Sequence, residues 1–142
     1  MEEMMLKYDA DSALALAMDP NTGAILAMVS KPDFDPNAYQ NYSTEVLNRN
    51  LPIWMSFEPG STFKIITGAA ALEETELDVH RKVTCTGKYD SGPRIFKCWG
   101  THGPVDFKEG MSNSCDVYFY VLAASMGPAP IEPMERQFMI GR

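Results

Sequence analysis

Three kinds of pattern are absent from this sequence of 142 residues. No apolar run approaches the roughly 20 residues that a membrane-spanning helix needs. The acidic start, MEEMMLKYD, also differs from a signal peptide, which begins with basic residues. Lysine and arginine form no block, and the formal net charge is −7, so no nucleic acid is expected as a partner. We therefore expect the chain, taken alone, to be soluble.

Cysteine and histidine are scarce and widely spaced, which argues against a local metal-binding motif. Cys85, Cys98 and Cys115 form no C-x-x-C pair. His80 and His102 lie at no spacing that would complete a zinc set. We therefore predict no metal and no cofactor. Cys85 and Cys98 suit a disulfide if the chain works outside the cytoplasm, and two buried free thiols fit the sequence equally well.

The remaining composition is that of a folded domain, with 45% apolar and 22% charged residues. Its first part contains a strong hairpin signal, because apolar runs at 13–18 and 24–29 flank the turn-forming segment DPNTG. Both runs are apolar on both faces, which predicts strands covered on both sides. We expect residues 1–12 to be the tail of a helix and residues 13–30 to be a β-hairpin.

Two longer helices are predicted further along the chain. Residues 62–74 are apolar nearly all round, which indicates a buried central helix, and Gly68 is expected to let another backbone pack closely. A second helix, at about 116–126, is closed by Gly127 and Pro128. Shorter features are extended segments at 82–85 and 94–98, a capping box formed by Asp106 and Glu109, and a last helix within 131–140.

Ser61 and Lys64 are the residues with the clearest chemical potential. Their spacing at the start of a helix places a hydroxyl and an amine on one face. A serine needs an adjacent base to act as a nucleophile, and burial disfavours the charged form of a lysine, which makes its amine a base. The helix N-terminus would also stabilise an oxyanion at Ser61.

A simpler interpretation makes Ser61 an N-cap and Lys64 an ordinary helical lysine. The four-residue pattern alone favours this interpretation. However, a lysine within an otherwise apolar helix needs a partner. The longer string FEPGSTFK at 57–64 also resembles the active-site signature of penicillin-binding-protein transpeptidase domains.

The resemblance covers about residues 10–127. It includes the segments AMDPNTGAILAM at 17–28, KPDFDPN at 31–37, FKCW at 96–99, and Ser114-Cys115-Asp116 followed by VYFY, which matches the second motif of the family. It implies an α+β fold of the penicillin-binding and serine β-lactamase type. Within this fold, residues 61–75 would form the active-site helix and residues 114–127 the second-motif helix.

The resemblance also implies a role for each site residue. Ser61 would attack the carbonyl of a D-alanyl-D-alanine stem peptide or of a β-lactam, and Lys64 would accept the serine proton. Ser114 would relay a proton toward the leaving amine, and Asp116 would orient Lys64 or bind the peptide amide. Without the resemblance, Ser114 and Asp116 would be interpreted as a helix cap.

The third motif of the family, Lys-Thr-Gly or Lys-Ser-Gly, does not occur in this sequence. We therefore expect residues 1–142 to be a partial domain that lacks the third motif and the C-terminal half, with exposed strand edges that favour self-association. The full-length protein would be anchored on the extracytoplasmic face of the membrane, with cell-wall synthesis partners. Three alternatives stay open: a D,D-transpeptidase fragment, a related serine β-lactamase or β-lactam-sensing domain, and an inactive truncated module.

Overall fold

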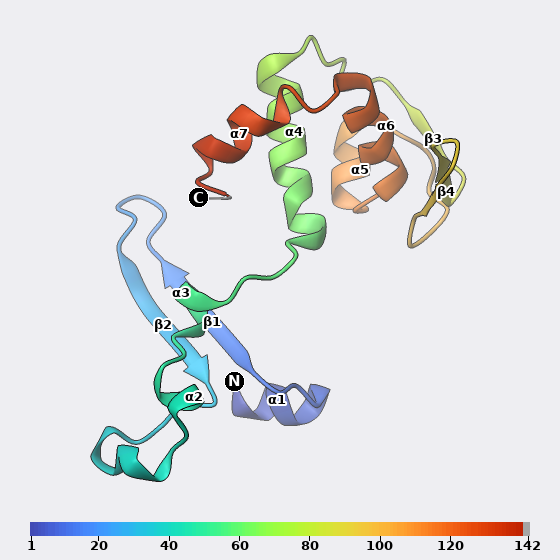
Figure 1. Ribbon diagram of the computed structural model, residues 1–142. Coiled ribbons are helices and arrows are strands. Elements are labelled where there is room, and N and C mark those ends of the chain that lie inside the picture. Colours follow the sequence, from blue (N-terminus) through green and yellow to red (C-terminus); the bar gives the residue numbers. More distant parts are fainter. Residues whose placement is uncertain (141–142) are drawn as a thin grey trace. The chain divides into compact units, whose positions relative to one another are not determined.

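The computed structural model describes residues 1–140. The chain divides into two compact units, Met1–Glu58 and Pro59–Arg142. The first contains a hairpin and short helices, and the second contains the longer helices and two small sheets (Figure 1). No helix in the described part of the chain combines the length and the apolar character needed to cross a bilayer.

The first unit is built around the predicted β-hairpin. Strands β1 (Ala13–Met18) and β2 (Ile25–Lys31) pair in antiparallel register. The Asp19 carboxylate accepts hydrogen bonds from the backbone N–H of Asn21 at 2.8 Å and from the Thr22 hydroxyl at 2.9 Å, which fixes the turn. The short helices of this unit are α1 (Glu2–Tyr8), η1 (Pro36–Asn41), α2 (Thr44–Leu47) and α3 (Leu51–Trp54).

The hairpin differs from the sequence prediction in its burial. Its strands were expected to be covered on both sides, but the side chains of Leu16, Ile25 and Leu26 are 48%, 53% and 70% exposed. The reason is the size of the sheet, since β1 and β2 form a two-stranded sheet with no third strand among residues 1–140. The apolar runs thus form the predicted strands, but the rest of the first unit covers only part of their two faces.

The second unit contains four helices and two small antiparallel sheets. The helices are α4 (Phe63–Glu74, after the 3₁₀ turn η2, Gly60–Thr62), α5 (Phe107–Ser112), α6 (Asp116–Met126) and α7 (Ile131–Gln137). The sheets pair β3 (Val83–Cys85) with β6 (Gly103–Val105), and β4 (Lys88–Asp90) with β5 (Ile95–Lys97). Helices α5 and α6 are the ones that pack against the strands. The largest core cluster consists of Ala71, Cys85, Val105, Cys115, Val117, Tyr118, Phe119 and Leu122.

Helix α4 buries one face only. Ile66 and Ala70 pack against Met134 of α7, whereas Ile65 and Leu72 are 55% and 51% exposed. The prediction of a helix buried nearly all round therefore holds for half of its circumference. The surface of α4 at Gly68 meets α5, and a Cβ there would lie 3.2 Å from side-chain atoms of Met111 and of Phe107. The close approach was expected, but the neighbours are side chains and not a backbone.

The ends of the helices in the second unit follow the predicted signals. Asp106 and Glu109 form the capping box at the start of α5, with hydrogen bonds of 2.9 and 3.0 Å. Helix α6 ends at Gly127, which has a positive φ of 72°. Because both signals are satisfied within a few residues of chain, they fix the start of α5 and the end of α6.

Candidate active site

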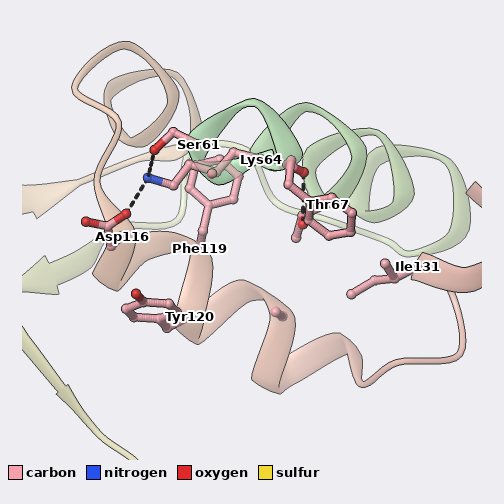
Figure 2. A pocket seen from close by; sticks show the side chains of 10 residues that line it. Ser61, Lys64, Thr67, Asp116, Phe119, Tyr120 and Ile131 are labelled. Carbon is pink, nitrogen blue, oxygen red and sulfur yellow. Dashed lines mark hydrogen bonds and ion pairs between the residues drawn. The ribbon is translucent and has the colours of Figure 1, made fainter. Parts of the chain in front are cut away.

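Lys64 is the centre of the candidate site. It lies in the first turn of α4, and its side chain is only 12% exposed. Ser61 lies in the preceding η2 turn, and the Lys64 Nζ is 3.2 Å from the Ser61 Oγ. Figure 2 shows the amine pointing toward Ser61 on one side and Asp116 on the other. The three-residue spacing thus brings the hydroxyl and the amine within hydrogen-bond distance.

Ser114 and Asp116 reach the same amine from the other side. Lys64 Nζ donates to the Ser114 carbonyl oxygen at 2.8 Å, to Ser114 Oγ at 3.0 Å and to Asp116 Oδ1 at 2.6 Å. These acceptors lie between α5 and α6 and in the first turn of α6. The structure therefore brings together all four residues that the sequence singled out.

Ser114 has an unusual backbone conformation. Its φ is 49°, in the left-handed region, where a residue with a Cβ is strained. The backbone N–H groups of Ser114 and Cys115 donate to the carbonyls of Met111 and Gly110, at 3.1 and 2.8 Å, which closes the turn after α5. The turn directs both the carbonyl and the hydroxyl of Ser114 at the amine, so strain here occurs at a residue that contacts Lys64.

The amine and the Asp116 carboxylate form a partly buried ion pair. Burial raises the pKa of Asp116, but the hydrogen bond and the positive charge of Lys64 outweigh burial and lower it below its ordinary value. An ammonium has three N–H donors, whereas four oxygen atoms surround Nζ. Ser61 Oγ is the most distant of them, so a neutral amine can turn its lone pair to Ser61 and keep its two N–H bonds elsewhere.

A pocket of about 430 Å³ opens beside this cluster. Its walls beyond the catalytic candidates include Thr67, Phe119, Tyr120 and Ile131, which Figure 2 shows along α4, α6 and the start of α7. Sequence reasoning missed these lining residues. A signal existed for Thr67, which follows Lys64 by three residues on the same helix face, but Ile131 comes from a helix whose packing the sequence did not predict.

Four side chains that are widely spaced in the sequence form a compact cluster in the structure. Cys85, Cys98, His102 and Cys115 meet in three dimensions, with their ligand atoms all within 4.8 Å of one another. Chain spacing did not reveal this set because each member comes from a different place, namely the end of β3, the residue after β5, the residue before β6 and the N-cap of α6. The three cysteines of the described chain are free thiols, so the disulfide considered for Cys85 and Cys98 is not present here.

The thiols of this cluster differ in their acidity. Burial raises the pKa of Cys85, but hydrogen bonds from the backbone of His102 and of Gly87 outweigh burial and lower it to about 7. Burial raises the pKa of Cys115 to about 12, and negative charge on Cys85 adds to this effect. Cys85 is therefore the more acidic of these two thiols, and its thiolate forms at a lower pH than that of Cys115.

Comparison with known proteins identifies the family and the fold of this chain. The family model of the penicillin binding protein transpeptidase domain matches residues 13–142. Stage V sporulation protein D of Bacillus subtilis is 42% identical over 96% of this chain and 22% of its own length. The peptidoglycan D,D-transpeptidase MrdA of Acinetobacter baumannii is 32% identical over 89% of this chain and 21% of its own length.

A solved structure with the same fold is the crystal structure of Pseudomonas aeruginosa PBP2 in complex with WCK 5153. It superposes with a TM-score of 0.73 and 27% identity, over 96% of this chain and 35% of the PBP2 chain. The chain belongs to the penicillin binding protein transpeptidase domain family, and the predicted α+β transpeptidase fold is confirmed. It spans about a fifth of the length of these two curated relatives.

Proposed function

We propose that this chain carries the acylation half of a serine D,D-transpeptidase site that cross-links peptidoglycan. The observation that carries the proposal is the cluster around the Lys64 amine, which contacts Ser61, Ser114 and Asp116 at hydrogen-bond distance. A nucleophile, a base and a group that orients the base are what acyl transfer to a serine requires. The names of the relatives support the same reaction class.

The acylation step uses Lys64 as a neutral amine. Ser61 Oγ attacks the carbonyl carbon of the substrate while its proton passes to the Lys64 Nζ, which forms a tetrahedral oxyanion. The negative charge develops at the positive end of α4, which stabilises it. Asp116 accepts a hydrogen bond from Nζ whether the amine is neutral or charged, so it holds the amine in place throughout the step.

Collapse of the tetrahedral intermediate breaks the C–N bond and needs a proton on the leaving amine. Ser114 Oγ is 3.0 Å from Nζ and can give its own proton to that amine while it takes the proton held by Lys64. The product is an ester on Ser61 and a free amine. In the second half-reaction the amine of another stem peptide attacks the ester, and Ser61 regains its proton.

The substrate class that fits is an acyl-D-alanyl-D-alanine peptide, with β-lactams as covalent substitutes. The pocket beside the nucleophile is lined mostly by apolar and aromatic side chains, which suits the small methyl side chains of alanine. Peptidoglycan lies outside the cytoplasmic membrane. The site would therefore act on the extracytoplasmic face, in a longer protein that is anchored there and assembles with other cell-wall enzymes.

The test is intact-protein mass spectrometry after incubation with a penicillin, on chains whose folding is verified by circular dichroism. We expect a single adduct on wild-type protein, located at Ser61 by peptide mapping, and none on Ser61→Ala. Lys64→Met should reduce the acylation rate by at least about 100-fold, as expected for loss of a general base. Ser56→Ala, which removes an exposed hydroxyl five residues before the nucleophile, is the matched control and should acylate at the wild-type rate.

A folded wild-type chain without an adduct would show that it does not acylate, although its family membership would stand. An adduct that persists in Ser61→Ala would identify another nucleophile. Acylation of Lys64→Met at the wild-type rate would remove Lys64 from the role of base.

A further inference from the structure

Positive charge is concentrated in one short segment of this acidic chain. Residues 81–97 contain five of the twelve lysine and arginine residues and a single acidic residue, Asp90. The rest of the chain has seven basic and eighteen acidic residues. The five basic residues of the segment are all exposed, namely Arg81, Lys82, Lys88, Arg94 and Lys97. Because charges of one sign on one surface attract ligands of the opposite sign, this pattern indicates an anionic ligand.

Two of these lysines face each other across the β4–β5 sheet. Lys88 pairs directly with Lys97. Residues in such positions have Cβ atoms about 4.5–5.5 Å apart, and like charges there are destabilising. Neither lysine forms an ion pair with a carboxylate among residues 1–140. The sheet therefore contains a repulsion that an anion bound between the two ammonium groups would remove.

Packing on one face of this sheet directs the two lysines to the other face. Tyr89 and Phe96 pair across the strands and pack on Tyr120 of α6, at centroid distances of 5.9 and 5.4 Å. Successive side chains of a strand point to opposite faces. Lys88 precedes Tyr89 and Lys97 follows Phe96, so both lysines lie on the face that is turned away from Tyr120.

Lys88 and Lys97 line a groove of about 420 Å³, which we call the basic groove. Its walls also contain Thr86, Thr101 and Trp99, whose side chain is 72% exposed. Ammonium groups and hydroxyls donate hydrogen bonds to a carboxylate, and an indole ring offers an apolar surface beside them. The groove therefore suits a ligand that combines carboxylates with apolar groups.

The basic groove adjoins the candidate active site through Trp99. The indole N–H of Trp99 donates to the Asn113 carbonyl at 3.0 Å. Asn113 directly precedes Ser114, whose hydroxyl contacts the Lys64 amine. A polymer bound at Trp99 would therefore lie beside the turn that carries Ser114.

We propose that the basic groove binds the free carboxylates of peptidoglycan stem peptides, at a site separate from the one that holds D-alanyl-D-alanine. Binding there would keep the polymer near Ser61 and so raise the effective concentration of its reacting ends. A concave groove fits a peptide better than it fits the flat surface of a lipid bilayer. The choice of peptidoglycan rests on the proposed function, whereas the anionic character of the ligand does not.

The test is a nuclear magnetic resonance titration of the chain with the tripeptide L-alanyl-γ-D-glutamyl-diaminopimelate. This probe carries the carboxylates but lacks D-alanyl-D-alanine, so it does not acylate Ser61. We expect the backbone amide signals of residues 86–101 to shift, with binding that weakens as salt is added. The same tripeptide with its carboxylates amidated should bind more weakly to the wild-type chain, because the charge that the lysines attract is gone.

A double variant tests the two lysines themselves. Lys88→Gln with Lys97→Gln should weaken tripeptide binding about 2- to 30-fold, as expected for the loss of two exposed charge contacts. Lys7→Gln with Lys108→Gln is the matched control, since it removes the same charge at exposed positions outside the groove. Because the lysines repel each other in the free chain, the groove variant should melt at or above the wild-type temperature.

Carboxylate-dependent binding by the wild type and the control, weakened in the groove variant, supports the site. Equal binding of the free and the amidated tripeptide overturns it on the wild-type chain alone, without any variant. Shifts confined to residues outside 86–101 overturn it as well. If the chain binds vesicles of phosphatidylglycerol but no tripeptide, the peptidoglycan assignment is wrong and the groove binds anionic lipid.

Penicillin acylation of Ser61 tests the proposed function separately. Carboxylate-dependent binding of the tripeptide by a chain that does not acylate would contradict the proposed function and leave the basic groove standing as a carboxylate site. Acylation by a chain that does not bind the tripeptide would overturn the basic groove alone.

Discussion

Ser114 combines two properties that are separable by mutation, a strained backbone and a hydroxyl that contacts Lys64. Ser114→Ala and Ser114→Gly both remove the hydroxyl, but only glycine relieves the left-handed φ. We expect the glycine variant to be more stable than the alanine variant by about 1 kcal/mol, as measured by urea unfolding. Both should lose acylation to a similar extent. Equal stability of the two variants would show that the turn carries no strain.

Two kinds of sequence evidence identified the four candidate catalytic residues: their spacing along the chain and the resemblance to a known family. Ser61 and Lys64 are three residues apart on one helix, so elementary helix geometry predicts their contact. Ser114 and Asp116 came only from resemblance to the family, because the chain between them and Lys64 has no periodic pattern that would predict the contact. Phe119 and Ile131 were missed because their place in the pocket wall depends on how α6 and α7 pack against α4.

Helices α5 and α6 meet at a place that has no room for a side chain. A Cβ on Gly110 would lie 2.7 Å from Cγ of Tyr118 and 2.9 Å from its Cδ1. Alanine is favoured over glycine in a helix by about 1 kcal/mol, but overpacking a core costs about 1–3 kcal/mol. The clash therefore outweighs the gain in helix propensity, and the substitution is destabilising. We expect Gly110→Ala to lower the free energy of unfolding. Ser112→Ala, on the exposed side of α5, should change it by less than about 0.5 kcal/mol.

The β1–β2 turn is expected to respond to acid. Hydrogen bonds from the backbone of Asn21 and from the Thr22 side chain hold the pKa of Asp19 below its ordinary value of 3.8. Because folding lowers this pKa, the charged form stabilises the turn. That contribution is complete above pH 3.8 and is lost as the pH falls through the lower folded value.

Titration of the Asp19 carboxyl by nuclear magnetic resonance measures the effect. The midpoint should lie below 3.8 in the wild-type chain and move up toward 3.8 in Thr22→Ala, which removes one of the hydrogen bonds. A wild-type midpoint at or above 3.8 would contradict the assignment of these bonds to the folded turn in solution.

For the helices and strands, signals contained within a few residues were sufficient to predict where an element begins or ends. The DPNTG turn, the Asp106 capping box and the Gly127 stop each predicted a boundary that the structure shows. The cluster of Cys85, Cys98, His102 and Cys115 was missed because Cys85 and Cys115 meet only after β3 pairs with β6 and α6 packs beside them. Pairing between distant segments leaves no spacing rule in the sequence.

Over the whole molecule, the exposed hairpin is the expected site of self-association. Each strand of the two-stranded sheet has an unpaired outer edge among the described residues, and Leu26 is 70% exposed beside it. The net charge of −7 opposes association at low ionic strength, so association should increase with salt. Sedimentation velocity at increasing protein concentration measures it.

Leu26→Lys should reduce the associated fraction at high salt. Leu6→Lys, at an 84% exposed position of α1, adds the same charge away from the sheet and should have little effect. If both variants reduce association equally, the effect of the lysine is not specific to the hairpin, and the prediction that the strand edges associate fails.

The edge-on contact between Trp99 and His102 gives the molecule an internal optical reporter. The chain has two tryptophans, and the other, Trp54, lies in the first unit with Arg49 over its ring. The Trp99 indole N–H donates to the Asn113 carbonyl at 3.0 Å, next to Ser114. Its emission is therefore sensitive both to the position of the imidazole ring and to the turn that carries Ser114. In a Trp54→Phe background, the fluorescence of one side chain would follow the surroundings of His102 and the turn that carries Ser114 together, without any attached dye.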